Sequence, residues 1–526
     1  MALLVSNVPW SEEPDALVRA AAGALRVAAA RVLRCDVIRK SLDARSRPPV
    51  WRATLRVELD DESKVLAKPP PGVRAWGERD EVRHRGDAAA PVAWSGGRVV
   101  VVGAGPAGMF AAMYLAEAGV PVLLLDRGGA VDARVGAVNG FWRRKLPLDP
   151  ENNLLFGEGG AGTFSDGKIY TRRRDGEIGW VLRHFVECGA KPEILEEGWA
   201  HLGTDKVREI LPMFRERLRA RGGEVRFGAR VDELVVEGGR VTGVVLADGS
   251  VERARAVVVA PGHSARDTVA MLVRAGAAAV PRPVAIGARI EHPQELVDQA
   301  RYGEARGDLP PSSYRLAWHP RVGAKARTFC MCPGGMVVPA MNAVDRVVVN
   351  GMSFAAQRGL WANSAVIVDV PVEVYGAPDP LAGFRWQDEI EARAFELGGG
   401  DYAAPAQRAA DLLAGVVSSS LPKVSYPFGA RPVDLRAVLP DVVLGAMVTA
   451  LRRFERDIAG FAGPDGVLLA PETRTTSPVV FTRDDRGQSV SLPGLFPSGE
   501  GAGYGGGIVS CALDGARAAR GVLASG

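Results

Sequence analysis

The sequence predicts an α/β protein with a parallel sheet at its centre, an inserted mixed α+β domain and a small N-terminal module. Three observations support this fold class. Residues 98–102 (RVVVV) form an apolar strand that runs through a glycine-rich turn into a helix expected over 109–118. A second glycine-rich segment, residues 494–507, lies near the other end of the chain. Finally, 526 residues are too many for one simple core, so about two or three domains are expected.

The early glycine-rich turn has the layout of a dinucleotide-binding βαβ unit of the Rossmann type. Gly103 permits the tight turn, Gly105 lets the backbone approach a pyrophosphate, and Gly108 lets the helix pack closely on the strand. A second strand, residues 120–125, ends on Asp126. Its carboxylate is expected to accept hydrogen bonds from a ribose diol, while the helix N-terminus receives the phosphates.

The nucleotide-binding domain continues beyond a long insertion. Residues 207–220 are expected to form a helix and residues 224–227 a short strand. Hairpin strands follow, with turns at Gly238-Gly239 and Asp248-Gly249. An apolar strand over 256–260 then ends in a Pro-Gly turn.

The pattern changes to strands such as 283–290, 328–331 and 345–350, interleaved with helices, and we interpret this region as an inserted domain. The chain returns to the first domain with a last helix over 508–523. The expected domain boundaries are 1–92 for the N-terminal module, 93–283 for the first part of the nucleotide-binding domain, 284–482 for the inserted domain, and 483–526 for the C-terminal part.

The N-terminal module reads as β-α-β-β, with strands over 2–8, 33–41 and 50–59 and a helix over 14–32. This order predicts a ferredoxin-like module. Residues 68–91, rich in Pro, Gly and charge, are expected to form the linker.

The chain resembles the glutathione-reductase-like FAD proteins, which pair an early Gly-x-Gly-x-x-Gly with a distant C-terminal small-Gly-acid segment. Within that group it is similar to the bacterial and plastid proteins called FAD-dependent dehydrogenases. The shared stretches are residues 156–168 (FGEGGAGTFSDGK), 201–205 (HLGTD), 260–268 (APGHSARDT), 328–335 (TFCMCPGG) and 499–508 (GEGAGYGGGI). One departure is Asp126, where glutamate is commoner in FAD relatives.

This resemblance implies a glutathione-reductase-like FAD domain, an inserted substrate domain and FAD as the cofactor. Glu500 would bond the ribityl or pyrophosphate part, and the helix after Gly507 would point its N-terminus at the flavin edge. The motif and the resemblance together give these expected cofactor-binding residues: Gly103, Gly105, Pro106, Ala107, Gly108, Asp126, Arg127, Gly159, Gly160, Ala161, Gly162, Thr163, Ser165, Asp166, Lys168, Val231, Ala260, Pro261, Gly262, Gly499, Glu500, Gly506, Gly507 and Ile508. The alternative is that residues 505–507 form only a flexible loop.

The catalytic residues are not defined by any motif. His263 follows the Pro-Gly turn and is a candidate near FAD, although it also fits a role in bracing that turn. Cys330 and Cys332 would share one face of a strand, either facing the flavin or as buried structural cysteines. Tyr314 lies on a probable strand of the inserted domain and is a weak candidate. Further candidates, for binding an anionic substrate, are Arg289, Glu291, Arg358 and Arg474, although such residues more often form surface or interdomain ion pairs.

Composition excludes several classes of protein. The net charge of +4 is small for the length, so a nucleic-acid partner is unlikely by charge alone. No apolar run is long enough for a transmembrane helix, and the N-terminus does not resemble a secretory signal. The five scattered cysteines fit a cytoplasmic protein, and no metal-ligand spacing occurs. The oligomeric state is not specified.

The function expected from these features is an FAD-dependent oxidoreductase that exchanges a hydride between a small organic substrate and flavin N5. No second Gly-x-Gly-x-x-Gly with a strand before it and a helix after it is found, so a second dinucleotide-binding domain is not expected. The electrons would come from the substrate itself, from NAD(P)H bound transiently, or from a protein donor. One alternative is an FAD monooxygenase acting on a small molecule. An alternative of another class is an RNA-associated flavoprotein, suggested by basic residues in the first module but lacking the aromatic RNP stretch.

Overall fold

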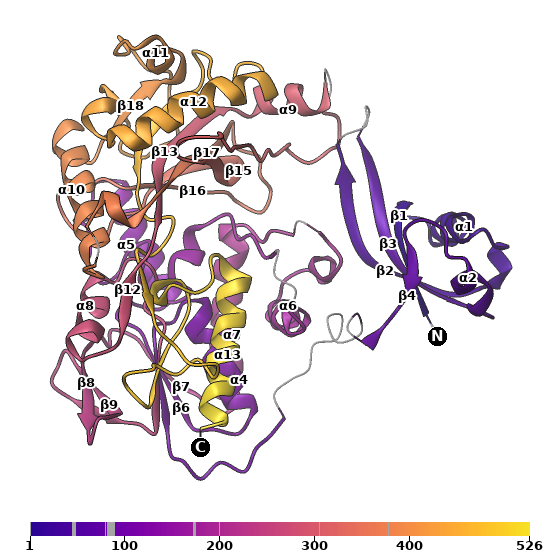
Figure 1. Ribbon diagram of the computed structural model, residues 1–526, viewed down its shortest axis with the longest axis horizontal. Coiled ribbons are helices and arrows are strands. Elements are labelled where there is room, and N and C mark those ends of the chain that lie inside the picture. Colours follow the sequence, from indigo (N-terminus) through magenta and orange to yellow (C-terminus); the bar gives the residue numbers. More distant parts are fainter. Residues whose placement is uncertain are drawn as a thin grey trace. The chain divides into compact units, whose positions relative to one another are not determined.

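The computed structural model describes residues 2–44, 49–78, 80, 90–171, 175–198, 200–303, 306–376 and 378–525. The chain forms two compact units (Figure 1). The first comprises Met1–Ala88, Lys168–His201 and Arg301–Ala305, and the second comprises Ala89–Gly167, Leu202–Ala300 and Arg306–Gly526.

The first unit contains a four-stranded antiparallel sheet in the order β2-β3-β1-β4. Its elements in chain order are β1 (Ala2–Pro9), α1 (Pro14–Leu25), a 3-10 turn η1 (Ala29–Arg31), β2 (Val32–Asp43), β3 (Val50–Leu59), α2 (Ser63–Ala67) and β4 (Val73–Ala75). The expected β-α-β-β order is confirmed. Two expectations are wrong. The first helix ends at Leu25, where Arg26 adopts a left-handed conformation. Part of the expected linker is strand β4, because Val73 is buried and pairs with β1.

A later segment of the chain completes this unit. It holds α6 (Ile178–Glu187) and the 3-10 turn η3 (Pro192–Leu195). The backbone N–H of Lys40 donates to the carbonyl oxygen of Glu196 (2.7 Å), and the N–H of Gly198 donates to the carbonyl oxygen of Lys40 (2.9 Å). The Lys40 ammonium lies over the rings of Trp10 and Trp51, 3.4 and 4.5 Å from their centroids.

The second unit is built on a five-stranded parallel sheet in the order β22-β11-β5-β6-β7. Its strands are β5 (Val99–Val102), β6 (Val122–Leu125), β7 (Glu224–Arg226), β11 (Ala256–Val259) and β22 (Leu495–Pro497). Strands β5, β6 and β11 are apolar and buried along their whole length, as expected for a parallel sheet covered on both faces.

Helices flank this sheet, and α4 and α13 lie side by side (Figure 1). The helices are α4 (Pro106–Glu117), α5 (Val131–Trp142), α7 (Thr204–Ala220), α8 (Arg266–Arg274) and α13 (Ile508–Leu523), with the 3-10 turns η2 (Gly160–Phe164) and η6 (Glu500–Ala502). The last helix has the expected bounds. Helix α4 begins three residues earlier than expected, because Pro106 is well suited to the first helical position.

Two antiparallel elements adjoin the parallel sheet. A three-stranded meander comprises β8 (Val231–Glu237), β9 (Arg240–Leu246) and β10 (Val251–Arg253), and its two turns fall at the expected glycines. A two-stranded ribbon comprises β12 (Ala279–Pro281) and β21 (Val479–Phe481).

The region between this ribbon's two strands carries an eight-stranded sheet (upper left in Figure 1). Its strands are β13 (Val284–Pro293), β14 (Ala317–Trp318), β15 (Ala326–Pro339), β16 (Val349–Met352), β17 (Trp361–Val370), β18 (Ala404–Arg408), β19 (Ala430–Pro432) and β20 (Val467–Glu472). The helical segments are α9 (Gln294–Tyr302), η4 (Val372–Val374), α10 (Ala382–Leu397), α11 (Ala409–Ala414), η5 (Leu435–Ala437) and α12 (Asp441–Asp457). The strand expected over 345–350 begins only at Val349.

In the part of the chain that the structure describes, no helix combines the length and apolarity needed to cross a membrane. The same residues contain no group of three or more His, Cys, Asp or Glu side chains suited to a metal ion.

Candidate functional site

The early glycine turn is shaped by contacts with the protein itself at two of its three glycines. Gly103 has φ +100°, and a Cβ there would lie 2.2 Å from the carbonyl oxygen of Ala260. A Cβ on Gly108 would lie 1.8 Å from the carbonyl oxygen of Gly103. Gly105 is different, because its nearest neighbour would be the Cα of Gly160 at 3.8 Å. Gly105 therefore leaves room beside the N-terminus of α4.

The glycine-rich segment of residues 157–162 lies against this turn. Gly160 has φ +57°, and a Cβ there would be 3.0 Å from the Cα of Gly105. A Cβ on Gly162 would meet the side chain of Ile508, the first residue of α13, at 3.4 Å. Residues from three distant parts of the sequence therefore meet at one place.

The C-terminal segment joins the same place. A Cβ on Gly499 would be 2.7 Å from the Cβ of Ala107, and one on Gly515 would be 2.0 Å from the Ala107 carbonyl oxygen. A Cβ on Gly501 would lie 2.2 Å from the carbonyl oxygen of Gly262. The expected segments around residues 103–108, 157–162, 260–262 and 499–508 thus converge at the carboxyl ends of β5 and β11.

Several glycines at this convergence face open space. A Cβ on Gly262, Gly506 or Gly507 would meet no atom within 4 Å. Gly506 does not adopt a positive φ, so the conformation of the backbone does not demand glycine there. Open backbone at the N-terminus of α13 suits the close approach of a flat ring, and the free N–H groups of α4 suit a diphosphate. The residues present therefore fit FAD.

Asp126 lies at the end of β6, where the sequence places it. Its two carboxylate oxygens accept the backbone N–H groups of Ala104 (2.6 Å) and Gly128 (2.8 Å). Burial raises the pKa of this carboxyl, and those two N–H groups oppose the shift. Asp126 therefore ties the glycine turn to the following loop, and its contact with a ribose stays a prediction.

A chain of ion pairs borders Asp126. Arg127 pairs with Glu151 (2.5 Å) and with Asp267 (2.6 Å), and Arg230 pairs with the same Glu151 (3.0 Å). Burial opposes the charge of Arg127, but Asp267 and Glu151 hold its pKa above the ordinary value. Val231, the next expected residue, begins β8 and is buried.

Arg134 of α5 is a central residue that no motif in the sequence indicates. Its side chain is fully buried. Its guanidinium donates to the carbonyl oxygens of Asn153 (2.7 Å), Leu154 (2.5 Å) and Glu158 (2.7 Å), and to the Thr163 hydroxyl (2.8 Å). Burial lowers its pKa to about 9, whereas the nearby Asp126 carboxylate favours its charged form. Arg134 therefore fixes the backbone on both sides of the glycine-rich segment.

Thr163, Ser165 and Asp166 contribute mainly to the loop itself. The Thr163 hydroxyl donates to the carbonyl oxygen of Glu158 (2.8 Å), and the Ser165 hydroxyl donates to that of Gly162 (2.8 Å). Asp166 is buried and accepts a hydrogen bond from Ser353. Lys168 belongs to the first unit, where it forms an isolated bridge with His201.

Asp514 of α13 is a second residue that the sequence analysis did not select. Its carboxylate pairs with Arg483 (3.0 Å) and accepts the Gly499 N–H (2.8 Å) and the Ser498 hydroxyl (3.1 Å). Arg483 also lies over the ring of Tyr504, 3.3 Å from its centroid. These contacts anchor the C-terminal segment to its helix. The sequence shows an aspartate within an Ala-rich helix, but neither its burial nor its partners can be read from it.

Glu500 lies in the 3-10 turn η6, within the converging segments. Burial raises the pKa of its carboxyl to about 7, and the guanidinium of Arg282 opposes this shift. Arg282 itself donates to the carbonyl oxygen of Gly503 (2.8 Å). Glu500 therefore titrates near neutral pH in the structure.

His263 lies beside a cluster of charges. Its Nδ1 is 2.8 Å from the Ser264 hydroxyl. The fully buried Glu391 pairs with Arg474 (2.6 Å) and with Arg266 (2.9 Å). Burial, together with the Arg474 guanidinium, lowers the pKa of His263 to about 4. The imidazole is therefore neutral at neutral pH.

The arrangement expected for Cys330 and Cys332 is wrong. Cys330 has φ +50°, and a bulge between Phe329 and Cys332 interrupts the pairing of β15 with β17. A bulge shifts the alternation of side chains, so residues two apart no longer share a face. Cys330 is partly exposed, whereas Cys332 is buried and its thiol donates to the Cys330 carbonyl oxygen (3.3 Å).

Tyr314 precedes β14 rather than lying on a strand, so that expectation is also wrong. It is buried against Phe461 and His292, with ring centroids 5.3 and 6.4 Å away. Burial raises the pKa of its hydroxyl above the usual range. Arg289, also expected only as a weak candidate, is fully buried and pairs with Glu472 (2.8 Å).

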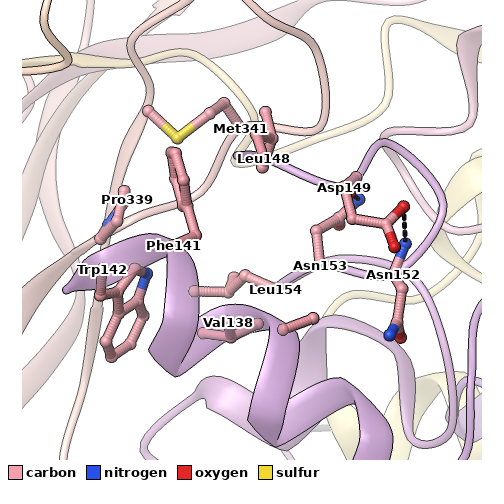
Figure 2. Close-up of a pocket in the computed structure, with 11 residues that line it drawn as sticks. Val138, Phe141, Trp142, Leu148, Asp149, Asn152, Asn153, Leu154, Pro339 and Met341 are labelled. Atoms are coloured by element: carbon pink, nitrogen blue, oxygen red, sulfur yellow. Dashed lines mark hydrogen bonds between the residues drawn. The ribbon is translucent and has the colours of Figure 1, made fainter. Parts of the chain in front are cut away.

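A small pocket lies between α5 and the eight-stranded sheet (Figure 2). Phe141 and Trp142 of α5 and Met341 form its apolar side, and Asp149 and Asn152 lie together at its other end. The Trp142 and Phe164 ring centroids are 6.3 Å apart, which places the pocket next to η2. No motif in the sequence indicates this pocket.

Comparison with known proteins defines the class. Residues 97–134 match a family model described as an FAD binding domain, residues 189–302 match one described as FAD dependent oxidoreductase, and residues 283–475 match one described as FAD-dependent protein, C-terminal domain-like. The protein is therefore an FAD-dependent oxidoreductase, an enzyme whose cofactor is FAD.

A protein of Clostridium beijerinckii, described only as uncharacterized, is 36% identical over 531 residues, covering 99% of each chain. The chain belongs to the same family as this Clostridium protein. Among solved structures, the flavin-dependent brominase Bmp2 is 13% identical with a TM-score of 0.38, over 81% of this chain and 79% of that one. A probable FAD-dependent monooxygenase of Pseudomonas aeruginosa, pqsL, is 14% identical with a TM-score of 0.33, over 80% and 83%. Similarity at this level does not specify a reaction.

Proposed function

We propose that this protein catalyses hydride exchange between a small organic substrate and FAD. The observation that carries the proposal is the convergence of four glycine-bearing segments, far apart in sequence, beside the open backbone at Gly506 and Gly507. When bound, FAD would supply the redox chemistry through its N5 position. The chain's own residues would bind the cofactor, orient the substrate and transfer protons.

The proposed cofactor contacts follow the converging segments. The N-terminus of α4, at Gly105, Pro106 and Ala107, would receive the diphosphate. Asp126 would meet the ribose, and the N-terminus of α13 at Gly507 would meet the flavin edge. Glu500, the first residue of η6, would bond the ribityl chain. The remaining residues expected from the sequence stay part of this proposal.

The proposed proton-transfer residue is His263. It follows Gly262, which contacts Gly501 of the C-terminal segment, and it is neutral at neutral pH. A neutral imidazole can accept a proton from a substrate as hydride leaves. Cys330, Cys332 and Tyr314 are less suited, because Cys332 and Tyr314 are buried and Cys330 lies in the β15 bulge.

We also propose the finer assignments of architecture. The parallel sheet with its meander supports a glutathione-reductase-like FAD domain (93–283 and 483–526). The eight-stranded sheet supports a substrate domain (284–482). The strand order of the N-terminal module (1–92) supports a ferredoxin-like arrangement. A cytoplasmic location and transient use of NAD(P)H also stay proposals.

The decisive experiment is anaerobic reduction of the purified, FAD-loaded protein. Candidate small substrates, NADH and NADPH would each be mixed with it, and loss of the visible absorbance of oxidised flavin would be followed. Reduction by a substrate with formation of an oxidised product supports dehydrogenation. A protein that carries no flavin and gains none on reconstitution with FAD would contradict the proposal.

The same protein distinguishes the monooxygenase alternative. Under labelled oxygen, a monooxygenase incorporates one labelled oxygen atom into its product, whereas a dehydrogenase incorporates none. The RNA-associated alternative is weakened by the structure, because Arg31 pairs with Asp60 (2.7 Å) and Arg34 with Asp36 (2.8 Å) in the basic segment. Failure to bind heparin at moderate salt would agree with this.

A further inference from the structure

Arg208 of α7 is a cation whose charge the described part of the protein does not neutralise directly. The residue is partly buried. Its Nε is buried without a hydrogen-bond partner among the described residues, and no carboxylate of those residues forms an ion pair with it. Asp205, one turn earlier, acts on it only electrostatically, and the Asp205 carboxylate accepts the backbone N–H of Ala355 (2.8 Å).

Arg208 is held next to the converging glycine segments. Its guanidinium carbon lies 4.4 Å from the ring centroid of Phe164, the last residue of η2. One turn further along α7, the Leu211 side chain would lie 2.6 Å from a Cβ on Gly159. The same face of α7 therefore carries both the contact with the glycine-rich segment and the arginine.

The neighbouring charged residues do not compensate the charge of the Arg208 guanidinium. Arg134 lies on the same ring, 5.0 Å from its centroid, and acts on Arg208 as a like charge. The carboxylates that act on Arg134 are already engaged: Glu158 pairs with Arg215 (2.8 Å), and Asp126 accepts two backbone N–H groups. Burial accordingly lowers the pKa of Arg208. A desolvated guanidinium with an unpaired N–H is unfavourable unless an anion completes it.

We propose that Arg208 is an anion-binding residue beside the cofactor site, and that its guanidinium receives an oxyanion in a bidentate contact. The guanidinium carbon lies over the Phe164 ring, and a guanidinium whose face packs on a ring keeps the N–H groups in its plane for two oxygens. The oxyanion is either the diphosphate of FAD or the carboxylate of a small substrate. This inference rests on the proposed cofactor position and adds the charge of the ligand.

The test compares Arg208→Gln and Arg208→Lys with the control Arg219→Gln. Arg219 lies on the same helix but is exposed and pairs with Glu216. In the first arm, FAD is titrated into each apoprotein by flavin fluorescence. In the second arm, sodium benzoate is titrated into each FAD-loaded protein by the visible spectrum. Thermal unfolding of each apoprotein checks that the variants fold.

If the anion is the diphosphate, Arg208→Gln raises the dissociation constant for FAD by about tenfold or more, and Arg208→Lys raises it less. If the anion is a substrate carboxylate, FAD binding is unchanged and the benzoate titration weakens by the same factor. The Arg219→Gln protein matches the wild type in both arms.

The inference is overturned if the folded Arg208→Gln protein binds both FAD and benzoate as the Arg219→Gln control does. Should Arg208→Gln fail to fold, the same comparison is made with Arg208→Lys, which keeps the charge but not the planar fork. A wild-type protein that binds no FAD contradicts the proposed function instead, so the two failures are distinguishable.

Discussion

At the scale of single residues, buried charges determine the geometry of the site. Arg134, Asp126 and Asp514 each bond backbone groups of a glycine segment. All three side chains are buried, so they do not exchange these backbone partners for water. Glycine segments have little intrinsic preference for one conformation, so these side chains supply the order that the segments lack.

Replacing Arg134 with methionine is expected to destabilise the fold and to weaken FAD binding. Four acceptors would each lose a guanidinium N–H donor, and Asp126 would lose a cation that favours its ionised form. Removing one partner of a buried charged network typically costs about 3–5 kcal/mol. Urea unfolding measures the loss, and Arg219→Met is the exposed control. An Arg134→Met protein as stable as that control would contradict this role.

Glu500 is expected to make the stability of the apoprotein depend on pH. The ordinary pKa of a glutamate carboxyl is 4.5, and burial raises the pKa of Glu500 to about 7 in the folded protein. Because the folded pKa is raised, its contribution to stability is fully present below pH 4.5 and is lost as the pH rises through about 7. Glu500→Gln should therefore reduce the fall in Tm of the apoprotein across this window.

Glu291 is also buried with a pKa raised to about 7, so part of the fall will remain in Glu500→Gln. The quantity to compare is the difference between the variant and the wild type at each pH. Identical pH profiles would show that Glu500 titrates as an ordinary glutamate.

At the scale of elements, the glycines of the site divide into two kinds. Gly108 is required by the protein, because a Cβ would lie 1.8 Å from the Gly103 carbonyl oxygen, whereas a Cβ on Gly506 would meet nothing within 4 Å. Gly108→Ala should therefore lower the free energy of unfolding by about 1–3 kcal/mol or more.

Gly506→Ala should leave the free energy of unfolding of the apoprotein within about 1 kcal/mol of the wild type. It should nevertheless weaken FAD binding by about tenfold or more, because the methyl group occupies the space for the ring. Equilibrium unfolding and FAD titration of the same preparations separate the two effects. Unchanged FAD binding in Gly506→Ala would place the flavin elsewhere.

How closely a predicted helix or strand agrees with the structure depends on the strength of its local sequence signal. Strands β5 and β6 and helices α4 and α13 are apolar or small-residue segments bounded by Gly and Pro, and they lie close to where they were expected. Strand β4 falls within the expected linker, because a strand of three residues with only Val73 buried carries little sequence signal. The β15 bulge at Cys330 was missed because its conformation depends on the Arg289 and Ser364 side chains, which bond the carbonyl oxygens of Cys330 and Phe329.

At the scale of the whole molecule, cofactor binding should stabilise the second unit. The converging segments come from both ends of this unit's chain, so a ligand that contacts them binds the folded state alone. A ligand at one hundred times its dissociation constant adds about 2.7 kcal/mol of stability. Thermal unfolding with and without FAD measures this, and riboflavin, which lacks the diphosphate and adenosine, is the control. A Tm unaffected by saturating FAD would contradict it.

Local sequence patterns are enough to place the strand–turn–helix units that meet at the candidate site, because a glycine-rich turn between a buried strand and a helix is a pattern with few structural solutions. The resemblance to FAD proteins added the cofactor class. Which side chains hold those segments in place depends on contacts that form only in the folded protein. Arg134, Asp514 and Arg208 act through neighbours distant in sequence, and a charged residue within an amphipathic or small-residue helix carries no local sign of such partners. The physical reason is that burial and pairing of charge are properties of the packed molecule, whereas turns and strands are properties of a few consecutive residues.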